Sequence, residues 1–143
     1  MLKKELIQLH AVFAQVKNYI EMHEGYKEFF QAYANLNITP QDYHTTKNEQ
    51  KGAVFVLSYG ISLFLKMETN PNFLLNGVPY DRQLTLIKKK INKYIKEPDS
   101  IINAYHSAVR EAQQRNSSKN VPQTFYTHPA VVYQEIAAVN SKV

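Results

Sequence analysis

Five histidines are the side chains of this sequence best suited to hold a metal ion. They are His10, His23, His44, His106 and His128. No two of them lie three or four residues apart, so no pair can chelate a metal from one helical turn. Packing of two helices can still join His10 to His44, with Glu49 or Asp42 as a third ligand for a divalent cation. The alternative is that both histidines are capping or surface groups.

Lysines form the strongest electrostatic feature of the chain. The cluster consists of Lys88, Lys89, Lys90, Lys93 and Lys96. In a helix, Lys89, Lys93 and Lys96 share one stripe, which is a pattern that neutralises phosphates. Further basic residues that extend this candidate nucleic-acid-binding set are Arg82, Arg110, Arg115 and Lys119. The alternative is a solvated helix face that keeps the protein in solution.

Charge is distributed unevenly between the two halves of the chain. Residues 1–70 hold seven Lys and seven acidic residues, whereas residues 71–143 hold ten Lys or Arg and five acidic residues. The whole excess of +5 therefore lies in the second half. This asymmetry favours a polyanionic partner for that half.

Several classes of chemistry have no support in the sequence. There is no Cys, which excludes a disulfide framework and a thiolate nucleophile. No phosphate-binding glycine loop, nucleophile elbow or H-E-x-x-H motif occurs. The start of the chain lacks the apolar core of a signal peptide, and no apolar run is long enough to cross a bilayer. We expect a non-enzymatic, cytoplasmic protein.

Helices must position these side chains, because Gly and Pro are scarce and the apolar periodicity is helical. A heptad pattern of apolar residues begins the chain and predicts a first helix that packs against another helix. This seam is formed by Leu2, Leu6, Leu9, Phe13, Val16 and Ile20. Thr39 and Pro40 resemble a helix start, and Thr46 with Glu49 has capping-box spacing. Thr46 and Glu49 therefore predict the start of a helix over about 47–67. This helix is apolar on nearly all sides, so we expect it to be central and buried.

Turn residues in 69–80 mark the best internal boundary. Beyond it, helices are predicted over about 82–96, ended by Pro98, and over about 100–115, capped by Asp99. Residues 116–126 are typical of a linker, and a short last helix is expected over about 130–139. The fold class is all-α, with about five or six helices and a C-terminal extension.

The segment PQDYHTTKNEQKGAVFVLS, residues 40–58, and the opening KKELIQLH resemble the archaeal uncharacterised protein family 0058. The likeness covers about residues 1–65. The residues that carry it are Glu5, Leu6, Leu9, His10, Pro40, His44, Lys47, Glu49 and the run 53–57. The resemblance implies a compact helical protein that forms a dimer. Members are sometimes labelled metal-binding and then carry further His residues after the Glu, where this chain has Gln50 and Gly52.

These patterns predict two units, a helical core over 1–70 in an antiparallel arrangement and a basic helical hairpin with a tail over 71–143. The leading hypothesis is an interaction protein that binds a nucleic acid or nucleoprotein through its basic half. A divalent-metal-binding homodimer that uses His10, His44 and Glu49 is the alternative, and a protein-binding adaptor is the third. A homo-oligomer, most simply a dimer, is expected because the N-terminal seam is long for so small a core.

Overall fold

A computed structural model describes residues 1–68, 74–75, 78–116, 136 and 139–140. In this part of the chain five helices surround one apolar core, which confirms the predicted all-α bundle. The helices are α1 (Lys3–Glu21), α2 (Gln31–Ala34), α3 (Lys47–Glu68), α4 (Tyr80–Tyr94) and α5 (Pro98–Asn116). Two-residue strands, β1 (Leu74–Leu75) and β2 (Val78–Pro79), pair antiparallel before α4. None of the described helices is both long enough and apolar enough to span a bilayer.

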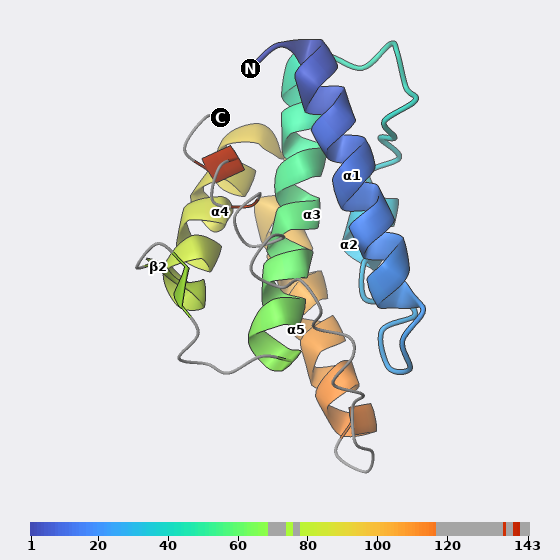
Figure 1. The fold of residues 1–143 in the computed structure, drawn as a ribbon, viewed down its shortest axis with the longest axis vertical. Helices are drawn as coiled ribbons and strands as arrows, with labels where there is room; N and C mark the ends of the chain where they lie inside the picture. Colours follow the sequence, from blue (N-terminus) through green and yellow to red (C-terminus); the bar gives the residue numbers. More distant parts are fainter. Residues whose placement is uncertain (69–73, 76–77, 117–135, 137–138, 141–143) are drawn as a thin grey trace.

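Helix α3 is the centre of the molecule, as its apolar sequence predicted. Every residue from Ala53 to Leu65 is buried. Figure 1 shows α1 and α2 on one side of α3 and α4 on the other, with α5 crossing behind. The predicted capping box starts α3, because the Thr46 amide donates to Glu49 Oε1 at 2.9 Å and the Glu49 amide donates to Thr46 Oγ1 at 3.1 Å.

Helices α1 and α3 run parallel, and the expected antiparallel arrangement of the first unit is wrong. Both begin at the same end of the bundle in Figure 1. His10 near the start of α1 bonds Gln50 near the start of α3, and Tyr26, just after α1, bonds Glu68 at the end of α3. The physical reason is the connection between the helices. Residues 22–46 return along the bundle through α2 before α3 begins.

The N-terminal seam divides into two sets of residues in the structure. Leu6, Phe13 and Ile20 are buried against the core, and His10 shares their face. Leu2 is 68% exposed, and Leu9 and Val16 are only partly buried. The buried stripe is therefore narrower than the seam, and part of the seam faces away from the core.

Two predicted helix boundaries are corrected by the structure. Thr39 and Pro40 begin a turn and not a helix, since the Asp42 amide bonds Thr39 O at 3.1 Å and no helix follows before α3. The carbonyls of Thr39 and Asp42 also accept from the side chains of Gln50 and Thr45, which hold this segment as a turn. Pro98 is the first residue of α5, where its missing amide hydrogen costs nothing.

Helices α4 and α5 complete the core around α3. Helix α4 is antiparallel to α3, with Tyr94 stacked on Phe55 at one end and Asp81 paired with Lys66 at the other. From α5, the Tyr105 hydroxyl donates to Val56 O at 2.6 Å. Near the C-terminus Ile136 and Val139 are buried, and Asn140 donates to Gln83 of α4. Most of the predicted linker and last helix lies outside the described residues.

Candidate functional site

The outward face of α4 carries a stripe of basic side chains. The buried residues of this helix are Tyr80, Gln83, Leu84, Ile87 and Ile91. At about 100° per residue, the opposite side of the helix presents Arg82, Lys89 and Lys93. Helix α4 ends at Tyr94 and not near residue 96 as predicted, so Lys96 lies in the connection just after it. All four are exposed to solvent. Lys88 is also exposed and Lys90 is partly buried, one on each flank of the stripe. We call Arg82, Lys89, Lys93 and Lys96 the α4 stripe.

The lysines of α4 have no acidic partners in the part of the chain that the structure describes. The ion pairs found there are Lys17–Glu21 and Lys66–Asp81. No described carboxylate oxygen therefore lies within 4.0 Å of the ammonium groups of the stripe. Because like charges are held close together without counter-charges, the face is poised to attract an anion.

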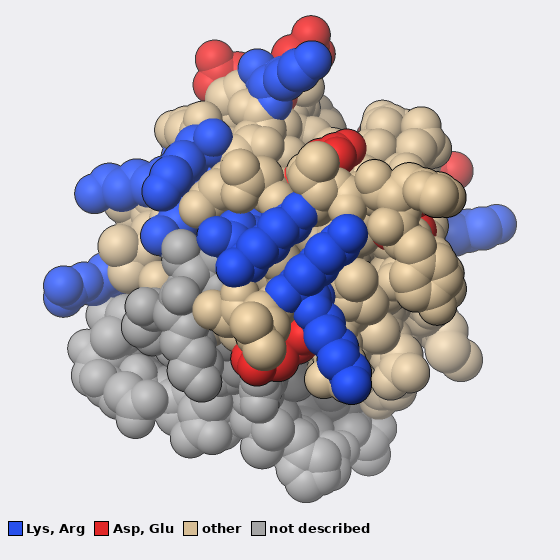
Figure 2. All heavy atoms as spheres, turned by 90° about the horizontal axis from the view of Figure 1, so that it is seen from above, with Lys and Arg blue, Asp and Glu red and all other residues tan. Residues whose placement is uncertain are grey.

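The positive surface is not confined to the second half of the chain. Lys51 of α3 lies with its Nζ 5.4 Å from the ring centre of Tyr94, and Lys93 lies 5.2 Å from the same ring centre. Figure 2 views the end of the bundle where α1 and α3 begin. Lys and Arg side chains gather across the middle and one side of this end, and Asp and Glu are fewer. The bundle thus joins both halves into one basic end.

Sequence reasoning missed Lys51 because this residue is outside any run of charge and sits in the neutral half. Only the antiparallel docking of α4 on α3 brings it beside Lys93. Two of the basic residues predicted to extend the stripe do not join it. Arg110 and Arg115 lie on α5, which runs toward the opposite end of the molecule (Figure 1). Lys119 lies outside the described residues.

Arg115 instead belongs to a hollow at the far end. This hollow has a volume of about 540 Å³, and its other lining residues include Glu21, Glu24 and Lys27. A second hollow, of about 740 Å³, lies at the basic end between the 35–38 segment and the α4–α5 connection. Tyr94 and Lys96 line it, so the second hollow adjoins the α4 stripe.

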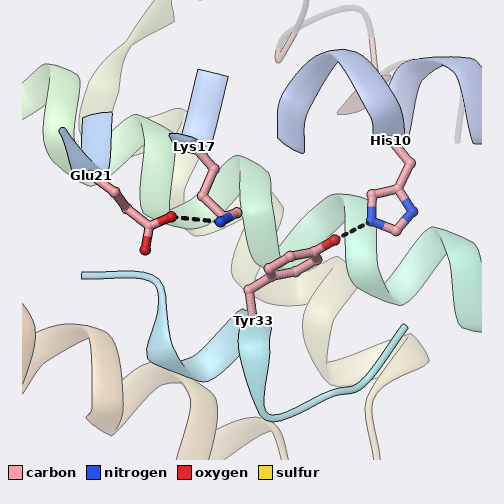
Figure 3. A network of polar contacts seen from close by, with 4 residues as sticks. All are labelled: His10, Lys17, Glu21 and Tyr33. Carbon is pink, nitrogen blue, oxygen red and sulfur yellow. Dashed lines mark hydrogen bonds and ion pairs between the residues drawn. The ribbon is translucent and has the colours of Figure 1, made fainter. Parts of the chain in front are cut away.

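A buried polar network surrounds His10, which has no solvent-exposed surface. His10 Nδ1 lies 2.6 Å from Gln50 Oε1, and His10 Nε2 lies 2.7 Å from the Tyr33 hydroxyl. Gln50 Nε2 donates to Thr39 O at 3.0 Å and to Thr45 Oγ1 at 2.8 Å. Figure 3 shows the Tyr33–His10 contact, with the Lys17–Glu21 ion pair beside it.

These contacts determine which atoms of the network donate. Thr39 O is a carbonyl and can only accept, so the Gln50 amide nitrogen must face it and Oε1 must face His10. His10 Nδ1 therefore donates to Gln50, and the neutral ring accepts from Tyr33 at Nε2. Thr45 completes the chain by donating to Asp42 O at 2.8 Å. Every group in the network is satisfied when His10 is neutral.

Burial shifts the pKa values of His10 and Tyr33 so that the neutral form of each ring is favoured. Desolvation lowers the pKa of His10, although the hydrogen bond to Gln50 partly opposes this effect. Burial raises the pKa of Tyr33 to about 12. Lys17 lies with its Nζ 5.9 Å from the Tyr33 ring centre and is already paired with Glu21. The network is therefore neutral and structural at ordinary pH.

The predicted metal ligands are not assembled in the structure. Both ring nitrogens of His10 are occupied by Gln50 and Tyr33, which leaves no lone pair for a cation. His44 is exposed, and the carboxylate of Glu49 caps α3. No group of three or more His, Asp or Glu side chains with metal-binding geometry occurs among the described residues.

Comparison with known proteins relates the first half of the chain to a protein family. Uncharacterised protein family UPF0058 matches residues 1–75. The UPF0058 protein of Methanothermobacter thermautotrophicus is 41% identical over 78 residues, a match that covers 54% of this chain and 76% of that protein. No solved structure matches this chain.

The matched segment contains α1, α2 and α3 with the whole His10 network and Lys51, and the α4 stripe follows it. This confirms the resemblance that the residues around His10 and His44 indicated. Since the family match spans more than half of its length, the chain belongs to Uncharacterised protein family UPF0058.

Proposed function

We propose that this protein binds a nucleic acid, or a nucleoprotein, through the α4 stripe, and that it acts by binding and not by catalysis. The observation that carries the proposal is the set of four exposed basic side chains, three on one face of α4 and Lys96 just after it, without described acidic partners. A phosphate backbone would relieve the repulsion within this set and release its own counterions.

The dimensions of the stripe suit a phosphate backbone. From Arg82 to Lys93 helix α4 rises by about 17 Å, at roughly 1.5 Å per residue. That length matches about five nucleotides of one strand at about 3.4 Å each. The stripe carries no side-chain pattern that reads base edges in a groove, so recognition should follow the backbone and the shape of the partner.

Binding to labelled RNA and DNA across a salt series tests this proposal. The expected result is an affinity that falls as salt rises, with a slope of about 0.7 to 0.9 per phosphate contact. Lys89→Gln should reduce that slope by about one contact. Lys27→Gln is the matched control, because Lys27 is also exposed but lies at the other end of the bundle.

Absence of affinity at low salt, or an affinity without a salt slope, would end the nucleic-acid proposal. The adaptor hypothesis would then take its place. A pull-down that compares the full chain with a variant in which the stripe is neutralised separates the two, since an adaptor should keep its protein partner without the basic charges.

A second copy of this chain is the partner that we infer for the outer face of α1. Val12 is 49% exposed and Tyr19 is 51% exposed, and with Leu2, Leu9 and Val16 they follow a heptad spacing. Pairing of this face with the same face of a second copy, about a two-fold axis, would cover its apolar side chains.

Light scattering at increasing protein concentration tests this association. A dimer is expected for the unchanged chain, and Val12→Glu with Tyr19→Glu should shift it to the monomer. Leu86→Glu, at a side chain that is 37% exposed on α4, is the control for an added charge at an exposed apolar position. A monomer at every concentration would refute the proposed pairing.

A further inference from the structure

Lys51 and Lys93 converge on the same aromatic ring from different halves of the chain. Their ammonium nitrogens lie 5.4 and 5.2 Å from the ring centre of Tyr94. Tyr94 is stacked on Phe55, with ring centres 6.0 Å apart and planes 8° from parallel. Since Phe55 is completely buried, the stack anchors Tyr94 and fixes the place where the two lysines meet.

Two ammonium groups held beside one phenol create a local excess of positive charge, which favours binding of an anion. Burial raises the pKa of Tyr94, but hydrogen bonding from Lys93 and the charges of both lysines lower it by a larger amount. The net shift of this pKa is therefore downward. Neither lysine has a described carboxylate within 4.0 Å. The convergence therefore offers several N–H donors and one O–H donor to an anion of the size of a phosphate group.

The hollow of about 740 Å³ opens beside this convergence, because Tyr94 lines it. Its apolar lining residues are Leu36, Ile38, Ile95 and Ile101, and its polar lining residues include Asn35 and Ser100. Glu49 and Glu97 also line it and would repel a second phosphate. An uncharged, flat and partly apolar group is the occupant that these surroundings favour.

We propose that Lys51, Lys93 and the Tyr94 hydroxyl bind one phosphate group of a single-stranded nucleic acid, and that the hollow receives the adjoining base. The inference rests on the proposed nucleic-acid binding and adds a specific site to it. A base can enter the hollow only when it is unpaired, so the site selects single strands over duplexes. Lys51 comes from the segment that the family match covers and Lys93 from the segment after it, so the site exists only where the two are packed together.

A double-mutant cycle on the full chain tests the shared phosphate. Lys51→Gln and Lys93→Gln should each weaken binding to a short single strand by about threefold to tenfold. The double variant should lose clearly less than the product of the two losses, because either change already breaks the same contact. Lys51→Gln with Lys89→Gln is the control pair, and there the losses should multiply.

The base-binding part is tested on the ligand, which avoids any effect on folding. A strand with abasic units keeps every phosphate and should bind about tenfold more weakly than the intact strand. A duplex of the same sequence should also bind more weakly. Equal binding of intact, abasic and duplex ligands would overturn the base site. If the Lys51→Gln and Lys27→Gln variants bind the single strand with the same affinity, the phosphate site is overturned.

Inorganic phosphate separates failure of this site from failure of the proposed function. The phenolate absorbance of Tyr94 is isolated by subtracting the titration of Tyr94→Phe. Phosphate held by the two lysines should raise the pKa of Tyr94 saturably, whereas chloride at the same ionic strength should have a smaller, non-saturable effect. A saturable shift without affinity for any strand would assign the site to a free phosphate compound, and no saturable shift together with no strand binding would refute both proposals.

Discussion

His10 is a titratable side chain in a site that stabilises only its neutral form. One ring nitrogen donates to Gln50 and the other accepts from Tyr33, so a second ring proton would leave Tyr33 without its acceptor. Burial also lowers the pKa of His10, because it removes the charged form of the ring from water. The unfolded chain takes up this proton near the usual pKa of about 6.5, whereas the folded chain takes it up only at lower pH. Acid therefore favours the unfolded state within that window.

The free energy of unfolding should fall as the pH drops below about 6.5, by at most about 1.4 kcal/mol per pH unit from this group. Urea unfolding between pH 7.5 and roughly pH 5, above the range in which most carboxylates titrate, measures the slope. His10→Gln should be less stable at pH 7.5 but should lose the slope. An unchanged slope in that variant would show that another group is responsible.

Tyr33 supplies the one hydrogen bond that His10 Nε2 receives. Tyr33→Phe should reduce the free energy of unfolding by about 1 to 3 kcal/mol, because it leaves a buried acceptor without a donor. Tyr43→Phe is the matched control, since Tyr43 is 79% exposed and its change should stay within about 0.5 kcal/mol. Equal effects of the two changes, measured by chemical denaturation, would contradict the network.

Helix α3 depends on close approach of its neighbours at two glycines. A Cβ atom at Gly60 would lie 2.5 Å from Phe30 Cε1 and 2.7 Å from Tyr105 Cε1, both on buried rings. A Cβ atom at Gly52 would meet chiefly the terminal Cδ1 of Ile95 at 2.8 Å, which is the flexible end of a side chain.

Gly60→Ala should therefore destabilise the protein by about 1 to 3 kcal/mol despite the better helix propensity of Ala. Gly52→Ala should be close to neutral, because a gain of about 1 kcal/mol in propensity offsets the displacement of Ile95. Thermal unfolding of the two variants side by side provides the measurement. If Gly52→Ala proves the more damaging variant, the rings of Phe30 and Tyr105 do not limit the packing of α3.

Local sequence signals predicted individual helices better than their directions. The capping box at Thr46 and Glu49 marks the start of α3, and the apolar run after it predicts a buried helix, because both signals are local. The parallel course of α1 and α3 depends on the path of residues 22–46, in which the four-residue α2 leaves little periodicity to recognise. The turn at Thr39 is hard to distinguish from a helix start, because the Thr39 carbonyl accepts from the side chain of Gln50, which is 11 residues away in the sequence.

In the candidate site too, local features are predictable from the sequence and contacts that depend on packing are not. The stripe on α4 follows from the spacing of its lysines, whereas the part played by Lys51 requires the packing of α4 on α3. His10 was predicted as a metal ligand because its residue type allows it. Its actual partners, Gln50 and Tyr33, are 40 and 23 residues away in the sequence, so no local pattern reveals them.

The whole molecule has one core that both halves of the chain build. Tyr94 covers Phe55, and Tyr105 contacts Tyr59 with ring centres 5.6 Å apart. These contacts cover the side of α3 that faces away from α1. The boundary predicted in 69–80 coincides with β1 and β2, but packing continues across it.

A fragment of residues 1–75, the extent of the family match, should not form a stable monomer. Without α4 and α5 it would lose Tyr94, which covers Phe55, and Tyr105, which covers Tyr59 and Gly60, and this apolar surface would then be exposed. We expect this fragment to self-associate or to lose cooperative urea unfolding. Light scattering and circular dichroism of the fragment and the full chain at equal concentration measure both. A monomeric fragment with the same unfolding midpoint as the full chain would mean that α4 and α5 are bound to a core that is already complete.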